Sequence, residues 1–185
     1  MESNLVMAII LGIISPVVTG VIGLIAYKMI KKQFASAQTQ HQVQGLLDVF
    51  KILDTDEHRN SRSMVYALYF EYLDTKQIKS FKGSKDVESV RGAFDVMGIL
   101  VKTENIHKND FLEMYGVLVY RCWQCLKADI ENERDSRNFP KFMFYFQWLA
   151  NASHNYWLQN NDVDISRIKL YHPDDPTRWV DFSTK

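Results

Sequence analysis

Residues 5–27 read LVMAIILGIISPVVTGVIGLIAY, and this stretch decides the organisation of the chain. Its one ionisable group is the Tyr27 phenol, which is neutral at pH 7. As an α-helix the stretch would be about 34 Å long, enough to cross a hydrocarbon core of about 30 Å. A lone span in lipid has to satisfy its own backbone hydrogen bonds, so it must be helical. The sequence therefore predicts a transmembrane anchor over residues 1–30.

A cleaved signal peptide is the alternative to a permanent anchor. The small residues of the Ala35-Ser36-Ala37 segment resemble a cleavage site. However, no basic region precedes the apolar run, the run is longer than a signal peptide needs, and lysines separate it from that segment. These features favour the permanent anchor.

Three lysines predict how the anchor is oriented. Lys28, Lys31 and Lys32 follow the apolar run at once, and no Lys or Arg precedes it. Because basic flanks stay on the cytoplasmic side, we expect a single-pass membrane protein with its N-terminus outside and its C-terminal domain in the cytoplasm.

Small side chains recur at helical spacing along the predicted span, and we call them the small-residue stripe. The stripe consists of Ala8, Gly12, Ser15, Thr19, Gly23 and Ala26. In lipid, small residues let two backbones approach, which predicts contact with another transmembrane helix, from a second copy or a different protein. The alternative is that small residues are simply common in membrane helices.

The rest of the chain has the composition of a folded helical domain. Apolar residues make up 46% of the sequence, and 22 basic side chains balance 22 acidic ones. This balance argues against a nucleic-acid partner bound by phosphate neutralisation. We expect an all-α fold with a helical stalk over 31–44, a bundle of four to five helices over 45–160 and an irregular tail over 161–185 that packs on the bundle.

Apolar periodicity and capping residues place the helices of this bundle. Residues 87–101 carry apolar side chains at spacings of three and four, as one face of a helix does. Ser84 is expected to cap that helix, and Asp54 with Glu57 to cap the one before it. Pro140 suits the first turn of the last helix. The predicted helices cover residues 56–74, 84–101, 110–133 and 139–158.

A resemblance to a known family follows from this pattern. The chain has one N-terminal span, a polar stalk, a helix with Arg59 and Arg62, and an aromatic last helix. Between them lies the motif Trp123-x-x-Leu126-x-x-x-Ile130-x-x-x-Arg134. The chain resembles a prokaryotic family of unknown function with one N-terminal transmembrane helix and a small helical cytoplasmic domain. The resemblance implies this architecture and assigns no catalytic residue.

Cys122 and Cys125 have the spacing of a redox pair or of half a metal site. Reactive thiols of this kind lie at a helix N-terminus, where the helix dipole lowers the thiol pKa. Here the pair lies well inside a predicted helix, on its apolar face, so buried core thiols are the favoured interpretation.

An acidic cluster follows the cysteines. It consists of Asp129, Glu131, Glu133 and Asp135. Paired carboxylates suit acid–base catalysis or a divalent cation. Because the four residues face two sides of a helix and Arg134 and Arg137 are close in sequence, a solvated, self-compensating helix end is favoured.

The last helix is apolar nearly all round, which is typical of a helix that is central or covered by a partner. Phe144, Trp148 and Trp157 lie away from its main apolar face, so they form a candidate partner surface. The alternative is that they belong to a central core helix or are covered by the tail.

These observations predict a membrane protein whose cytoplasmic helical domain is a non-catalytic interaction or accessory module in a membrane complex or homo-oligomer. The lipid bilayer and other transmembrane helices are its expected partners, and no catalytic residue, metal site or cofactor is predicted. The alternative is a membrane-tethered enzyme, or a redox or metal protein, that uses Cys122 and Cys125 or the acidic cluster of residues 129–135.

Overall fold

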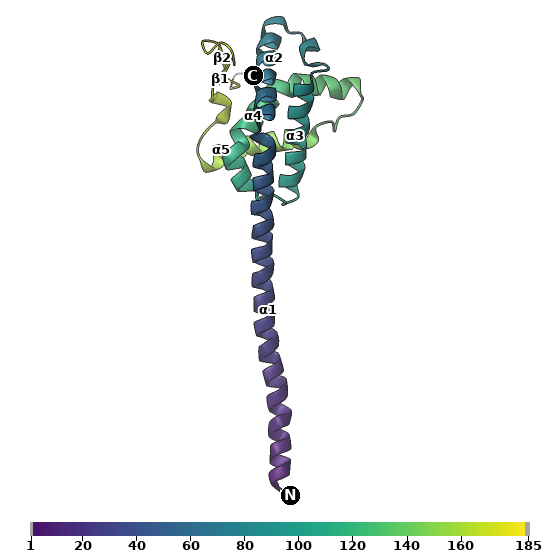
Figure 1. The fold of residues 1–185 in the computed structure, drawn as a ribbon, viewed down its shortest axis with the longest axis vertical. Coiled ribbons are helices and arrows are strands. Elements are labelled where there is room, and N and C mark those ends of the chain that lie inside the picture. Colours follow the sequence, from purple (N-terminus) through teal and green to yellow (C-terminus); the bar gives the residue numbers. More distant parts are fainter. Residues whose placement is uncertain (1, 184–185) are drawn as a thin grey trace. The chain divides into compact units, whose positions relative to one another are not determined.

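The computed structural model describes the backbone of residues 2–183 and the side chains of residues 26–34, 36–78 and 81–183. It contains α1 (Glu2–Leu53), α2 (Asp56–Thr75), α3 (Lys85–Lys102), α4 (Lys108–Ser136) and α5 (Phe144–Asn160) (Figure 1). Short 3-10 turns, η1 (Ile78–Phe81) and η2 (Ile165–Arg167), and a hairpin of β1 (Leu170–Tyr171) and β2 (Trp179–Val180) complete it. The predicted all-α class is confirmed.

The chain divides into two compact units, residues 1–41 and residues 42–185. The first unit lies within helix α1, and residues 42–53 of the same helix belong to the second unit. No helix in the described part of the chain has an apolar stretch of the length that crossing a bilayer requires. The side chains of residues 1–25 lie outside that part, so the predicted anchor over residues 1–30 stays a prediction.

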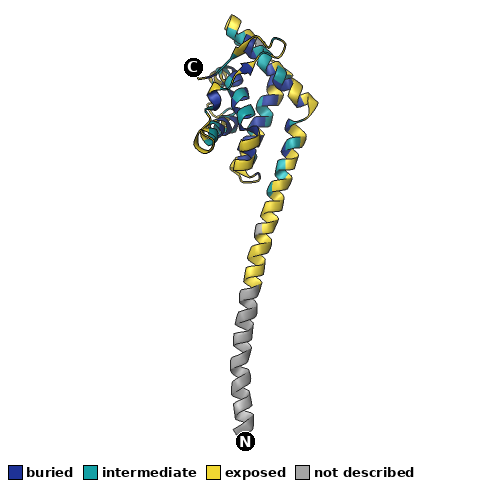
Figure 2. Ribbon diagram, turned by 90° about the vertical axis from the view of Figure 1, so that its left-hand side faces the viewer, coloured by how far each residue is buried: buried dark blue, intermediate teal, exposed yellow. Residues whose placement is uncertain are grey.

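The second unit is a helical bundle built around one apolar core. Helix α5 packs against α3 and α4, and α2 packs against the same two helices. Figure 2 shows the inward sides of these helices buried and their outer sides exposed. Among the largest side chains with almost no exposed surface are Leu53, Phe94, Phe111, Leu126, Ile130 and Phe146.

Local sequence signals set the starts of α2 and α3. Ser84 caps α3 as predicted, with its hydroxyl accepting from the Val87 N–H. The predicted cap of α2, Asp54, was wrong by one residue. The capping residue is Thr55, whose hydroxyl accepts from the His58 N–H. Asp54 instead accepts from the Tyr115 hydroxyl at 2.7 Å, so its carboxylate links α4 to the junction of α1 and α2.

Helix α5 begins at Phe144, later than the predicted start at residue 139. Asn138 and Met143 have left-handed backbones, with φ of 49° and 53°. L-residues in that region interrupt a right-handed helix, so residues 139–142 form a turn in which Pro140 lies outside α5. The Arg134 guanidinium donates to the Phe142 carbonyl at 2.8 Å and ties this turn to α4.

Two glycines bring α5 close to its neighbours. A Cβ on Gly98 of α3 would overlap the Tyr145 carbonyl of α5. A Cβ on Gly116 of α4 would lie 2.8 Å from the Trp157 indole nitrogen. Both positions therefore need a residue without a side chain if α5 is to pack this tightly.

The C-terminal tail folds back on the bundle. Its strands pair antiparallel, with Leu170 opposite Val180. Phe182 is buried, and its ring lies 5.9 Å from that of Tyr69 on α2. The Arg178 guanidinium reaches both carboxylate oxygens of Asp74, at 3.0 and 2.9 Å.

Candidate functional site

The two cysteines lie in the core of the bundle. Cys122 and Cys125 are both buried thiols. The Tyr66 hydroxyl lies 3.4 Å from the Cys122 sulfur, and burial raises the pKa of the Cys122 thiol to about 11. A redox or metal-binding cysteine needs an accessible thiolate, and this environment opposes both requirements. The favoured interpretation of the pair as core thiols is confirmed.

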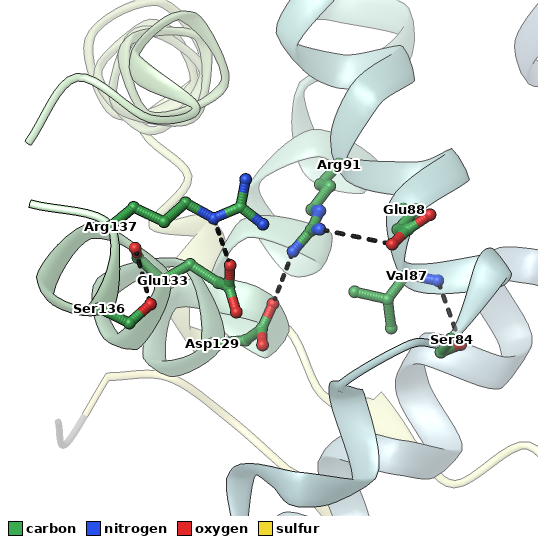
Figure 3. A network of polar contacts seen from close by, with 8 residues as sticks. All are labelled: Ser84, Val87, Glu88, Arg91, Asp129, Glu133, Ser136 and Arg137. Carbon is green, nitrogen blue, oxygen red and sulfur yellow. Dashed lines mark hydrogen bonds and ion pairs between the residues drawn. The ribbon is translucent and has the colours of Figure 1, made fainter. Parts of the chain in front are cut away.

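The acidic cluster contains one buried carboxylate, which corrects its interpretation as a solvated helix end. Asp129 is only 1% exposed, and one of its oxygens lies 3.2 Å from the guanidinium of Arg91 on α3 (Figure 3). Arg91 also lies 3.9 Å from Glu88. The predicted compensation within the helix end holds for Glu133, which pairs with Arg137 at 2.6 Å. Sequence spacing did not reveal Arg91, because it belongs to another helix.

Burial raises the pKa of the Asp129 carboxyl, and the charge of Arg91 opposes that rise. The same arginine stacks on the Phe142 ring at 5.2 Å, and Arg137 lies on that ring at 4.9 Å. This polar network, defined as Arg91, Asp129, Glu133, Arg137 and the Phe142 ring, therefore joins α3, α4 and the turn before α5. Its charged groups are engaged with one another, as expected of a structural contact.

The remaining acidic residues do not converge with the network. Glu131 is exposed and lies 3.9 Å from Lys127, and Asp135 is exposed. Among the residues that the structure describes, no three His, Cys, Asp or Glu side chains are arranged to hold a metal ion. The cluster of residues 129–135 is thus not assembled into one site.

A second polar group lies where α1 meets α2. His58 is 4% exposed, and its Nε2 atom is buried without a hydrogen-bond partner among the described residues. Burial, followed by the nearby charge of Arg62, lowers the pKa of His58 to about 4. Arg62 donates to the Leu53 carbonyl at the end of α1. The imidazole is therefore neutral at pH 7 and packs on the Phe94 ring.

Two of the three residues of the candidate partner surface lie together. Phe144 is 42% exposed and Trp148 is half-buried. The ammonium of Lys102, from α3, lies over the rings of Phe144, Tyr145 and Trp148 at 5.0, 5.3 and 5.6 Å. Trp157 differs, because its indole N–H donates to the Leu112 carbonyl at 3.0 Å and its ring packs α5 against α4.

A groove of about 420 Å³ follows the outer side of α5, beginning at Trp148, and we call it the α5 groove. Helix α4 contributes Lys108 and Asn109 to one wall. Helix α5 contributes Trp148, Asn151, Ala152, Asn155, Tyr156 and Gln159, with Asn160 at the far end. Sequence reasoning missed this groove. The polar residues at 151, 155 and 159 share one helical stripe, but such a stripe is also typical of a plain solvent-facing side.

The anchor-related residues lie partly within the described side chains. Lys28, Lys31 and Lys32 are exposed on α1. Large apolar side chains are interspersed with them and are also exposed: Tyr27 at 64%, Met29 at 58%, Ile30 at 51% and Phe34 at 73%. Of the small-residue stripe, Ala26 is described and exposed, and the other five members lie outside the described side chains.

Comparison with known proteins gives one family. A family model described as "Domain of unknown function (DUF4760)" matches residues 15–153, which is most of the chain. This match agrees with the predicted resemblance to a family of unknown function. Neither the curated proteins nor the solved structures give a significant match.

Proposed function

We propose a function for a chain that belongs to the DUF4760 family of domains of unknown function: a single-pass membrane protein whose cytoplasmic helical bundle is a non-catalytic interaction module. The module would serve a membrane complex or a homo-oligomer. Its N-terminus would lie outside, and residues after the anchor would lie in the cytoplasm.

One observation carries the membrane part of this proposal. Tyr27, Met29, Ile30 and Phe34 each expose at least half of their surface. Exposed apolar clusters of this kind mark interaction sites. Tyrosine rings favour the headgroup level of a bilayer, and lysines extend their ammonium groups from there into water. The interspersion of these apolar residues with Lys28, Lys31 and Lys32 therefore supports a segment at the membrane surface, next to the apolar residues 5–27.

The state of the reactive groups supports a non-catalytic role. Both thiols are buried, and Asp129 is paired with Arg91 inside the bundle. By contrast, Phe144 and the α5 groove lie on the outside, where a partner has access to them. This distribution of buried reactive groups and exposed surface favours a binding role over a catalytic one.

Fractionation of native membranes tests the anchor. We expect the full chain to stay in the membrane pellet after alkaline carbonate extraction. Replacing Ile10, Ile14 and Val18 with Glu should release it, since charged side chains at the centre of a span are strongly disfavoured. Matched Glu substitutions at the exposed Gln33, Gln40 and Gln44 should leave it in the pellet. Full release of the unaltered chain by carbonate contradicts the anchor.

Crosslinking in the same membranes tests the interaction role. We expect the unaltered chain to form discrete crosslinked species, and Gly12→Ile with Gly23→Ile to weaken those that depend on the small-residue stripe. Gly20→Ile is the matched control, because Gly20 lies in the same span but off that stripe. A chain that purifies as a monomer, without crosslinked species of any kind, contradicts the proposal.

A further inference from the structure

The α5 groove is lined by hydrogen-bonding groups that the fold does not use. The side-chain amides of Asn109, Asn151, Asn155 and Gln159 have no hydrogen-bond partner within the described residues. Each amide offers two N–H donors and a carbonyl acceptor. A single amide can therefore pair with both the N–H and the C=O of a peptide backbone.

Three of these amides form a ladder with a regular spacing. Asn151, Asn155 and Gln159 are four residues apart on α5, so successive amides are separated by about 6 Å along the helix. In an extended polypeptide, alternate residues lie about 6.7 Å apart and present their backbone groups on the same side. The ladder therefore matches the repeat of an extended chain closely enough for each amide to meet every second residue.

The floor of the groove has room for side chains. Trp148, Ala152 and Tyr156 follow one another at single-turn spacing along α5, and all three line the groove. The small Ala152 leaves a hollow between the two aromatic rings. Tyr156 is fixed at its end of the hollow, because its hydroxyl donates to Glu113 at 2.8 Å. An aliphatic or aromatic side chain of a bound segment fits such a hollow.

The two ends of the groove carry opposite charge. At the Trp148 end, Lys102 and Lys108 lie over the ring at 5.6 and 5.8 Å, and neither has an ion-pair partner in the described part of the chain. At the other end lies the carboxylate of Glu113, which accepts from Tyr156 at 2.8 Å and from Asn161 at 3.4 Å. This polarity favours one direction of a bound segment, with its carboxylate near the lysines.

We infer that the α5 groove binds an extended polypeptide segment of a partner protein, with the amide ladder holding its backbone and Lys102 and Lys108 holding a carboxylate. The inference rests on the proposed interaction role and names the part of the bundle that performs it.

Selection of binding peptides tests the inference. The full chain, purified in mild detergent, is presented to a phage-displayed library of random twelve-residue peptides. We expect enriched peptides to share an Asp or Glu at a fixed distance from an apolar residue. Synthetic versions should bind at least about tenfold more weakly to the Asn151→Ala, Asn155→Ala double variant, because up to four hydrogen bonds are lost.

Two further variants distinguish a loss of binding at the α5 groove from a loss caused by damage to the bundle. Ala152→Leu fills the hollow, retains every amide and should also weaken binding. Asn60→Ala makes the same change at an exposed asparagine on α2, away from the groove, and should leave binding unchanged. Circular dichroism of all variants should give matching unfolding temperatures.

Several outcomes overturn the inference. These are the absence of enriched peptides, equal binding by the double variant, and binding of neutral oligosaccharides on a glycan array in place of peptides. Crosslinking in membranes keeps this failure distinct from failure of the proposed function. If crosslinked species persist unchanged in the double variant, the interaction role stands and the α5 groove is not its site.

Discussion

Replacing Arg91 with Met should destabilise the bundle strongly at neutral pH. Arg91 supplies the charge that faces Asp129, at 3.2 Å, and Asp129 is only 1% exposed. Removing one partner of a buried ion pair typically costs about 3–5 kcal/mol, because the remaining charge stays buried. The Arg91 side chain keeps 12% exposure, so we expect the lower end, about 3 kcal/mol. For a domain of this size, the melting temperature should fall by roughly 10 °C.

The same change should make stability depend on pH. Burial already raises the pKa of the Asp129 carboxyl against the opposing charge of Arg91, and loss of that charge raises it further. Between the ordinary carboxyl pKa, about 4, and the raised value, the folded state binds more protons than the unfolded chain. Stability then falls as pH rises through this window, so acidification should recover part of the loss.

Thermal unfolding followed by circular dichroism in mild detergent, at pH 7 and pH 5, measures both effects. Adding Asp129→Asn to Arg91→Met should restore most of the stability, because no charge remains buried. Glu88→Gln is the matched control. It removes the exposed carboxylate 3.9 Å from Arg91 and should change stability by less than about 0.5 kcal/mol. An Arg91→Met loss that is equal at both pH values, or is not relieved by Asp129→Asn, refutes the reasoning.

Three further predictions follow from buried groups and close packing. Cys122 and Cys125 should react with a maleimide only as fast as the bundle opens, and rapid native labelling contradicts their placement. NMR should show a neutral His58 imidazole down to about pH 4. The stability of the bundle should fall from pH 6.5 to pH 4, because the unfolded chain binds a proton that folded His58 does not. His58→Gln should remove that pH dependence. Gly98→Ala should cost about 1–3 kcal/mol by overlap with α5, whereas Gly92→Ala, which meets no atom within 4 Å, should stabilise α3 by about 0.5–1 kcal/mol in the same melts.

The sequence predicted a helix well where its cap and its apolar face both lie within the same segment. Helix α3 runs from Lys85 to Lys102 behind its Ser84 cap, close to the predicted range, since its apolar face and its cap lie within the same segment. The start of α5 was wrong because Asn138 and Met143 adopt left-handed backbones. Asparagine tolerates that conformation, but methionine gives no such signal, so Pro140 was the stronger and misleading cue.

The polar network could not be predicted from spacing, because its central pair joins residues 38 positions apart. In the sequence, Arg134 and Arg137 follow Asp129 closely, which suggested that its charge is compensated within the same helix. In the bundle, the Asp129 side of α4 faces α3, and Arg91 is the cation that reaches it. Pairing between helices depends on how they are arranged, and helical periodicity carries no information about which faces meet.

Two kinds of polar group in the bundle bear on function in different ways. Asp129 is held by Arg91 of α3, and Tyr115 by Asp54 between α1 and α2, so a ligand would have to break those contacts to use them. The amides of Asn151 and Asn155 are exposed to solvent and have no partner within the described residues. Exchanging their bonds to solvent for bonds to a peptide costs little, because no internal contact is lost. Recognition is therefore expected where the fold leaves polar groups uncommitted, and α5 presents such groups in a regular array.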